Sequence, residues 1–214
     1  MLKYILFDLD GTLTDPKEGI TKSVSYALKA FNIEKEPDEL LCFIGPPLKE
    51  QFMLYANLTE NEAEKAVSIY RERFAPIGLF ENKIYDGVIE LLKKLKNDGY
   101  VLAMATSKPY VFAEKIAEKY NIAPYMTIIE GSELDGRNTD KAAVIKNVME
   151  KLGAKPDNTV MIGDREYDCI GAEKNSIPCV GVSYGYAKEG ELEKSSVFKI
   201  AKTPQELYCI LTQM

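Results

Sequence analysis

The sequence predicts an α/β fold, in which a doubly wound parallel sheet is interrupted by an inserted all-helical domain. Short apolar runs such as 4–7 and 101–106 alternate with helical patterns along most of the chain. These runs are apolar at every position, which is typical of strands that helices bury on both faces of a parallel sheet. Residues 15–83 contain only helical patterns, so they predict an insertion after the first strand.

The elements of the predicted core follow from hydrophobic periodicity and from start and stop signals. We expect Asp86 to cap a helix that Gly99 ends, and Asp140 to begin a helix that Gly153 ends. Together these elements predict a Rossmann-like core. The expected strands are 4–7, 101–106, 126–130, 159–162 and 178–182, and further helices are expected at 109–120 and 204–211.

The inserted segment begins and continues with strong helix-start signals. Asp15-Pro16 with Glu18 predicts an N-cap, a first-turn proline and a capping box, and Thr59 with Glu62 predicts a second capping box. Shorter helices are expected between 37 and 56, with a break at Gly45-Pro46-Pro47. We therefore divide the chain into a core, residues 1–14 and 84–214, and a helical domain, residues 15–83.

Composition narrows the class of partner. The 214 residues carry a net charge of -6, which disfavours nucleic acid because the general attraction to phosphate backbones is missing. No stretch is long and apolar enough to cross a bilayer, and the first residues do not form a signal peptide. The four scattered cysteines are then expected as reduced, buried thiols of a cytoplasmic protein. We expect no nucleic-acid or membrane partner.

The chain contains no histidine. This removes the commonest general base, the commonest metal ligand and every nucleophile that histidine activates. Acid–base chemistry must therefore come from carboxylates, lysine, tyrosine or cysteine, and a bound metal should have oxygen ligands.

Polar residues follow several predicted strands at the point where each strand ends. Ligands of open parallel sheets bind outside these carboxyl ends, so residues far apart in sequence should converge there. A cluster of acids needs a cation, and Mg²⁺ suits a site of carboxylates plus a substrate phosphate. Asp8 and Asp164 are the expected carboxylate ligands, while Thr106 and Lys141 would bind phosphate. The convergent residues are Asp8, Asp10, Gly11, Thr12, Thr106, Ser107, Lys108, Asp140, Lys141, Gly163, Asp164, Arg165 and Asp168.

These residues match, in order and placement, the four motifs of a known superfamily. The matching stretches are Asp8-Leu9-Asp10-Gly11-Thr12, Thr106, Lys141 and Gly163-Asp164-Arg165-Glu166-Tyr167-Asp168. The chain resembles the haloacid dehalogenase-like hydrolases over essentially its whole length, and it is most similar to the phosphoglycolate phosphatase-like branch. In that family the helical insertion is a cap over the active site.

The resemblance implies a role for each residue. Asp8 would be the nucleophile that forms an aspartyl-phosphate, and Asp10 the acid and base for the leaving oxygen and the water. Thr106 and Lys141 would stabilise the phosphoryl group, and Asp168 would orient Lys141 or a metal-bound water. The implied Mg²⁺ ligands are Asp8, Asp10 and Asp164, and the implied phosphate or substrate contacts are Gly11, Thr12, Ser107, Lys49 and Arg71.

Some assignments stay open at this point. Arg165 could be a surface residue or a substrate contact, and Ser107 replaces an asparagine that many relatives carry. Gly45-Pro46-Pro47 could be a simple helix break or a loop that faces the active site. Lys49 and Arg71 would bind a substrate carboxylate.

The implied activity is Mg²⁺-dependent hydrolysis of small phosphorylated metabolites by a monomer or homodimer. Phosphoglycolate is the first candidate substrate, and a nucleoside monophosphate, as in a 5'-nucleotidase, is the alternative. A phosphoglucomutase-type transferase is disfavoured because its cap histidine is missing, and a dehalogenase because Asp10 is present. A phosphonatase would need a cap lysine such as Lys22 or Lys49. A phospho-binding regulatory module would have no use for Asp10.

Overall fold

The computed structural model describes residues 1–135 and 137–214. It divides into two compact units: unit 1, residues 1–15 and 84–214, and unit 2, residues 16–83. The two crossings between them include β2 (Thr14–Asp15) and β3 (Lys83–Ile84), which pair as a two-stranded sheet. Among the described residues, no helix has the length and apolarity needed to cross a membrane.

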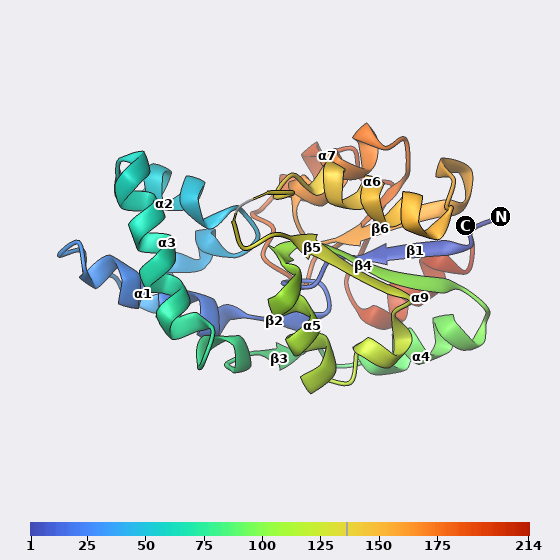
Figure 1. Cartoon of the computed structure of the whole chain (residues 1–214). Coiled ribbons are helices and arrows are strands. Elements are labelled where there is room, and N and C mark those ends of the chain that lie inside the picture. The colour runs from blue at the N-terminus through green and yellow to red at the C-terminus, as the bar shows by residue number, and fades with distance from the viewer. Residues whose placement is uncertain (136) are drawn as a thin grey trace. The chain divides into compact units, whose positions relative to one another are not determined.

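Unit 1 contains a six-stranded sheet in the order β5-β4-β1-β6-β7-β8, and every neighbouring pair is parallel. The sheet runs through the centre of unit 1 in Figure 1, which confirms the predicted α/β class. Because β1 lies between β4 and β6, the chain reverses its winding direction there, and such switch points are where ligands bind. The strands are β1 (Tyr4–Phe7), β4 (Val101–Pro109), β5 (Ile128–Ser132), β6 (Thr159–Gly163), β7 (Cys179–Val182) and β8 (Lys199–Ala201).

Helices cover both faces of this sheet, as the uniformly apolar strands require. Figure 1 shows α6 and α7 on one face and α4, α5 and α9 on the other. Leu6, Met161 and Cys179 from the sheet pack with Val144, Ile145 and Ala172 from α6 and α7 in one buried cluster. The helices are α4 (Val88–Asn97), α5 (Tyr110–Lys119), α6 (Lys141–Leu152), α7 (Glu166–Lys174), α8 (Glu191–Lys194) and α9 (Pro204–Leu211).

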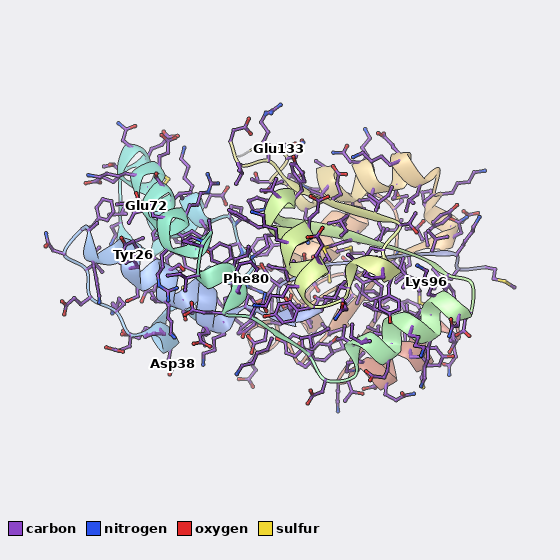
Figure 2. The ribbon with its side chains drawn as sticks, turned by 60° about the horizontal axis from the view of Figure 1, so that its bottom comes forward. Tyr26, Asp38, Glu72, Phe80, Lys96 and Glu133 are labelled. Carbon is purple, nitrogen blue, oxygen red and sulfur yellow. The ribbon has the colours of Figure 1, made fainter. Side chains whose placement is uncertain are left out.

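Apart from Lys83 of β3, the regular elements of unit 2 are helices. Helix α1 (Lys17–Lys29) packs on α3 (Glu60–Phe74), and α2 (Leu48–Ala56) packs on α3 as well. Phe43 and Phe52 lie 5.0 Å apart between ring centroids and are buried, so aromatic packing holds this small core together. Charged side chains such as Asp38 and Glu72 project outward (Figure 2). Segments of 3-10 helix cover 37–43 and 78–80 in this unit, and 123–125 and 156–158 in unit 1.

Some of the predicted helix-start signals are confirmed and others are wrong. The capping box of Thr59 and Glu62 is present, with reciprocal bonds between main chain and side chain. The caps predicted for Asp15 and Asp86 are wrong: α1 and α4 begin after Pro16 and Gly87, without a side-chain cap. Asp15 instead accepts a hydrogen bond from the Tyr186 hydroxyl, a long-range partner that local sequence cannot reveal.

Other expectations need smaller corrections. Strand β4 continues to Pro109, beyond the predicted end at 106, so Thr106 lies inside the strand. The short edge strand β8 was not predicted, because its three residues carry too little pattern. The cysteines are not uniformly buried, since Cys169 and Cys179 are buried but Cys209 is exposed.

Candidate active site

The register of the sheet brings three sequence segments to one edge. Phe7, the last residue of β1, pairs with Met104 of β4 and with Ile162 of β6. Asp8 follows directly, and its N–H donates to the Ile162 carbonyl at 2.9 Å. Thr106 and Asp164 lie two residues beyond those partners, so they emerge beside Asp8 at the carboxyl ends of the strands.

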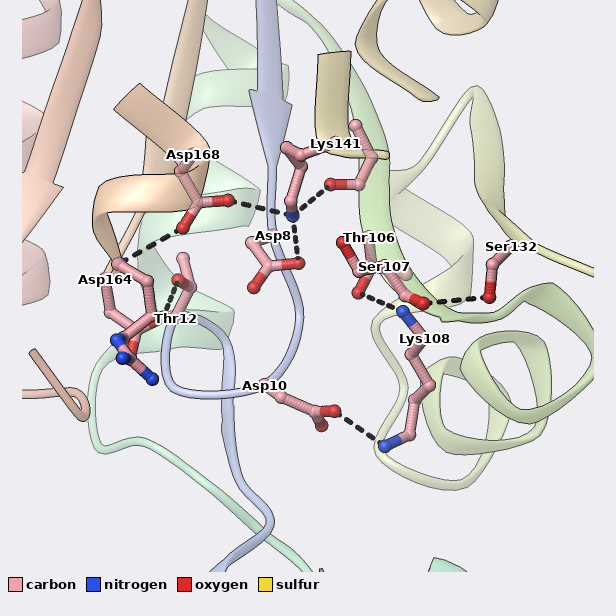
Figure 3. A network of polar contacts seen from close by, with 12 residues as sticks. Asp8, Asp10, Thr12, Thr106, Ser107, Lys108, Ser132, Lys141, Asp164 and Asp168 are labelled. Carbon is pink, nitrogen blue, oxygen red and sulfur yellow. Dashed lines mark hydrogen bonds and ion pairs between the residues drawn. The ribbon is translucent and has the colours of Figure 1, made fainter. Parts of the chain in front are cut away.

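Lys141 joins this edge from the first turn of α6. Its ammonium lies 2.7 Å from Asp8 Oδ1 and 2.8 Å from Asp168 Oδ1, and it donates to the Ala105 carbonyl at 3.0 Å. Figure 3 shows Lys141 between the two carboxylates. The lysine is 6% exposed, so its charge is stabilised by these partners rather than by water. Lys141 therefore fixes Asp8 in place and supplies positive charge beside it.

Asp168 has two structural tasks. One carboxylate oxygen pairs with Lys141, and the other accepts the N–H of Arg165 at 3.1 Å as the helix cap of α7. The side chain is fully enclosed, with 1% exposure. Asp168 therefore contacts Lys141, as the resemblance implied, and it also anchors the start of α7.

Asp164 accepts hydrogen bonds from two other segments of the chain. Its Oδ2 accepts the main-chain N–H of Tyr186 at 2.7 Å, and its Oδ1 lies 3.4 Å from the Thr12 hydroxyl, which donates to it. The Tyr184 hydroxyl in turn donates to the Thr12 carbonyl at 3.1 Å. The Thr12 side chain thus contacts the acid at this edge, and the loop after β7 fixes both residues.

Two glycines make this close packing possible. Gly11 has a φ of +83°, and a Cβ there would lie 2.1 Å from an Asp164 carboxylate oxygen. A Cβ on Gly185 would lie 2.4 Å from Asp164 Oδ2 and from the Gly11 carbonyl. Only glycine allows the two backbones to approach the acid this closely.

Asp10 faces a second lysine. Its Oδ2 lies 2.6 Å from Nζ of Lys108, and both side chains are largely buried. Among the described residues, Asp10 Oδ1 is buried and has no hydrogen-bond partner. Asp8 and Asp10 therefore come from one short segment but pair with different lysines (Figure 3).

The segment that carries Thr106 departs from regular strand geometry. The pairing of β4 with β5 shifts register between Ala105 and Pro109. Thr106 is 2% exposed, and its hydroxyl accepts the Lys108 N–H at 3.3 Å. The Ser107 carbonyl accepts the Ser132 hydroxyl at 2.8 Å. Hydrogen bonds on both sides of Ser107 therefore stabilise this irregularity of β4.

Burial and mutual repulsion shift the titration of the acids. Burial raises the pKa of Asp164 well above its ordinary value, and the carboxylates of Asp168 and Asp8 raise it further. Burial raises the pKa of Asp168 to about 6, against the opposing effect of Lys141. Burial also raises the pKa of Asp10, although Lys108 opposes the shift. Burial disfavours the charge on Lys141, but Asp168 and Asp8 outweigh this effect and raise its pKa.

The charges at this edge fit a divalent metal. Ligand oxygens of Asp8, Asp164 and Asp168 lie within 4.8 Å of one another, and all three residues are buried. With Lys141 as the paired cation, ionisation of the three acids leaves two uncompensated negative charges. The all-oxygen donor set and this residual charge suit Mg²⁺. The Asp10 carboxylate, predicted as a ligand, is not part of this group of three and pairs with Lys108.

Two predicted substrate residues belong to unit 2. The Lys49 ammonium pairs with Glu60 at 2.8 Å and with Glu64 at 2.7 Å, on the surface of that unit. Arg71 is half-buried on α3, and burial lowers its pKa. Within unit 1, the guanidinium of Arg165 pairs with Glu191 at 2.7 Å, so this arginine is bound within its own unit.

Sequence reasoning left two parts of the site without a role. Lys108 was expected at this edge, directly after Thr106 and Ser107, but nothing in the sequence paired it with Asp10. The Tyr184-Gly185-Tyr186 stretch after β7 gave no signal, because it reaches Asp164 through main-chain contacts and packing rather than through a reactive side chain.

Several curated proteins are similar to this chain. A 5'-nucleotidase from Pseudomonas aeruginosa is 48% identical over 195 residues, which cover 89% of this chain and 88% of that protein. The tyrosine-protein kinase PtkA of Mycobacterium tuberculosis is 35% identical over 91% of this chain, which spans 66% of that longer protein. A phosphoglycolate phosphatase from Vibrio parahaemolyticus is 26% identical over 96% of this chain and 94% of its own length.

A solved structure and a family model also match this chain. The crystal structure of a protein described as a predicted phosphatase from Clostridium acetobutylicum is 47% identical, covers all of both chains and superposes with a TM-score of 0.97. The family model for haloacid dehalogenase-like hydrolases matches residues 5–182. This match confirms the resemblance carried by the four motifs. The chain belongs to the haloacid dehalogenase-like hydrolases.

Proposed function

We propose that this chain is a Mg²⁺-dependent phosphomonoester hydrolase that acts through an aspartyl-phosphate on Asp8. The observation that carries the proposal is the position of Asp8, buried at the sheet edge, paired with Lys141 and beside the acid Asp164. A carboxylate held in this way is a pre-positioned nucleophile. Phosphatase activity is also what the names of the similar proteins indicate.

In the first half of the reaction, an Asp8 oxygen attacks phosphorus and the bond from phosphorus to the leaving oxygen breaks. Asp10 transfers its proton to that leaving oxygen, and the product alcohol departs. Lys141 keeps Asp8 oriented, and the Thr106 hydroxyl and nearby N–H groups bind phosphoryl oxygens. The raised pKa of Asp10 favours the protonated form that this step needs.

In the second half, a water molecule attacks phosphorus and gives its proton to Asp10. The bond between phosphorus and the Asp8 oxygen breaks, which releases inorganic phosphate and restores the Asp8 carboxylate. Asp10 thereby regains the proton that it gave to the leaving group, so protons balance over one cycle.

The fit of the acidic group supports a role for Mg²⁺. Asp8 and Asp164 would hold it with their carboxylates, and Asp10 would contribute through the main chain of the 8–10 segment. The ion would offset the charge of the phosphoryl group as Asp8 approaches it. Asp168 would act one contact further out, by holding Lys141.

Unit 2 is proposed to be the cap that selects the substrate. It is a separately packed helical insertion, and small-molecule substrates are commonly enclosed by such mobile elements. Lys49 and Arg71 remain its proposed contacts to an anionic substrate group. We propose that the protein works in the cytoplasm, as a monomer or homodimer.

Nucleoside monophosphates are the first substrates to test. The relative at 48% identity is a 5'-nucleotidase, whereas the phosphoglycolate phosphatase is 26% identical. This difference favours the nucleotide alternative over phosphoglycolate, although both are small phosphomonoesters that the site could process.

The test is phosphate release from a panel of phosphorylated metabolites by the purified chain. The panel contains nucleoside 5'-monophosphates, phosphoglycolate, sugar phosphates and a phosphotyrosine peptide, each with Mg²⁺ or with EDTA. We expect Mg²⁺-dependent release, highest for the nucleotides, and no release by the Asp8→Asn variant. Equal release by that variant, or release that EDTA does not affect, would contradict the covalent or the metal-dependent part of the proposal.

A further inference from the structure

We propose that Lys108 is a positioning residue for Asp10, with a role separate from that of Lys141. The inference rests on the proposed function, because it assigns a task within that reaction. Among the described contacts, each lysine serves a different acid of the 8–10 segment: Lys141 pairs with Asp8, and Lys108 pairs with Asp10.

The contact itself is short and sheltered. Nζ of Lys108 donates to Asp10 Oδ2 at 2.6 Å, and the two side chains are 6% and 11% exposed. An exposed pair would exchange partners with water and contribute little, but this pair is shielded from solvent. The ammonium therefore holds one defined orientation of the carboxylate.

Contacts of the backbone around Lys108 orient its side chain. The lysine lies in the irregular part of β4, where its N–H donates to the Thr106 hydroxyl and the preceding carbonyl accepts from Ser132. Gly131 of β5 approaches so closely that a Cβ there would lie 2.3 Å from the Lys108 carbonyl. Main-chain contacts on both sides thus fix the starting point of the lysine side chain.

This arrangement distinguishes the two oxygens of Asp10. Oδ2 is occupied by Lys108, whereas Oδ1 is buried without a hydrogen-bond partner among the described residues. A buried polar oxygen without a partner is costly, and in enzymes such atoms often await a substrate group. We therefore assign Oδ1 as the oxygen that exchanges the proton with the leaving group and with water.

The reaction offers a readout that a purely structural role would not affect. Breaking the bond to an alkyl alcohol requires a proton donor, whereas 4-nitrophenolate leaves readily without one. The parameter kcat/KM covers the steps up to alcohol release, so it isolates the step in which Asp10 acts as an acid. A misplaced Asp10 should reduce hydrolysis of an alkyl phosphate far more than hydrolysis of an aryl phosphate.

The experiment compares wild type, Lys108→Met and Lys108→Arg on glycerol phosphate and 4-nitrophenyl phosphate. We expect Lys108→Met to reduce kcat/KM for the alkyl ester by about 10²-fold and for the aryl ester by less than about tenfold. Lys108→Arg should recover most of the alkyl activity, because it restores a cationic donor. Lys115→Met, an exposed lysine of α5, is the matched control and should behave as wild type.

A double variant separates positioning from direct substrate contact. In an Asp10→Asn background, Lys108→Met should cause no further loss on the alkyl ester. Equal losses on both esters, or an additive loss in the double variant, would overturn the role of Lys108. If Lys108→Met does not fold, Lys108→Gln is measured in the same way. Failure of the wild type to release phosphate from both esters and from nucleoside 5'-monophosphates would instead refute the proposed function.

Discussion

The charged groups at the sheet edge of unit 1 and those on the surface of unit 2 are organised differently. In unit 1, residues from separate segments meet in buried ion pairs, such as Lys141 with Asp8 at 2.7 Å. In unit 2, pairs such as Lys35 with Glu39, four residues apart, form on the surface. Because the pairs at the sheet edge are buried, losing one partner strongly lowers stability. Solvent and salt weaken the exposed pairs of unit 2, so losing one of those has little effect.

This contrast indicates where function is fixed and where it can vary. At the sheet edge, removing one charged side chain leaves its partner buried without a compensating charge. The surface of unit 2 can exchange charges at little cost, which suits a domain proposed to set substrate preference. Five substitutions or conditions, taken in order of expected effect, test this contrast.

The largest effect is expected from Asp8→Asn, which removes the nucleophile while preserving shape. Phosphate release from an aryl phosphate should fall by at least about 10³-fold, since no alternative nucleophile is positioned there. Mg²⁺ binding, followed by isothermal calorimetry, should weaken but persist through Asp164. Asp157→Asn, an exposed acid of unit 1, is the control. Full turnover by Asp8→Asn would rule out the covalent route.

Lys141→Met should reduce both activity and stability. It leaves Asp8 and Asp168 buried without their cation, a change that typically costs about 3–5 kcal/mol of unfolding free energy. Urea denaturation of the metal-free protein measures that cost, and phosphate release measures activity. Wild-type stability for this variant would show that the buried pairs do not hold the sheet edge together.

Mg²⁺ should stabilise the protein more at pH 8 than at pH 5. The folded-state pKa of Asp168 is raised to about 6 and that of Asp164 is raised well above its ordinary value. An acid with a raised folded pKa binds its proton more tightly when folded, so the metal-free protein loses stability as pH rises through this range. The proposed Mg²⁺ ion would bind the ionised acids and would offset that loss.

Thermal unfolding with Mg²⁺ and with EDTA at both pH values measures this effect. The increase in Tm should be larger at pH 8, and Asp164→Asn should abolish the difference between the two pH values. An equal increase at both pH values in the wild type would mean that the metal does not bind these acids.

A moderate effect is expected from Arg73→Met in unit 2. Its guanidinium forms a two-pronged contact with Glu81, at 2.8 and 2.9 Å, and is partly shielded from solvent. Such a bidentate pair should contribute about 1 kcal/mol to unfolding free energy. Urea denaturation should show this loss while kcat on 4-nitrophenyl phosphate stays unchanged. A loss as large as that of Lys141→Met would erase the contrast between the units.

The smallest stability effect is expected from Lys49→Ala. Its two ion pairs are exposed, so Tm should stay unchanged within experimental error. If this lysine binds an anionic substrate group, KM for that substrate should rise while KM for 4-nitrophenyl phosphate does not. A marked decrease in Tm would contradict the view that unit 2 tolerates charge exchange at its surface.

The sequence predicted the sheet and the acids at its edge because local and global signals agree there. The apolar run 4–7 specifies a buried strand, and its position beside Asp8 places the acid without further information. Lys108 was not assigned a role, because its contact with Asp10 depends on an irregularity of β4 that no local pattern reports. The Asp15 cap failed for the same reason, since a distant tyrosine binds that carboxylate.

The order of the chain has a consequence for how the protein folds. Strand β1 has both of its partners, β4 and β6, far along the sequence, whereas unit 2 is one continuous segment between them. During synthesis, unit 2 can fold before the partner strands of β1 have been made. Pairing of β2 with β3 then shortens the effective loop that β1 and β4 must close. Because the insertion lies between β2 and β3, this pairing keeps the first strand close to the segment that leads to β4.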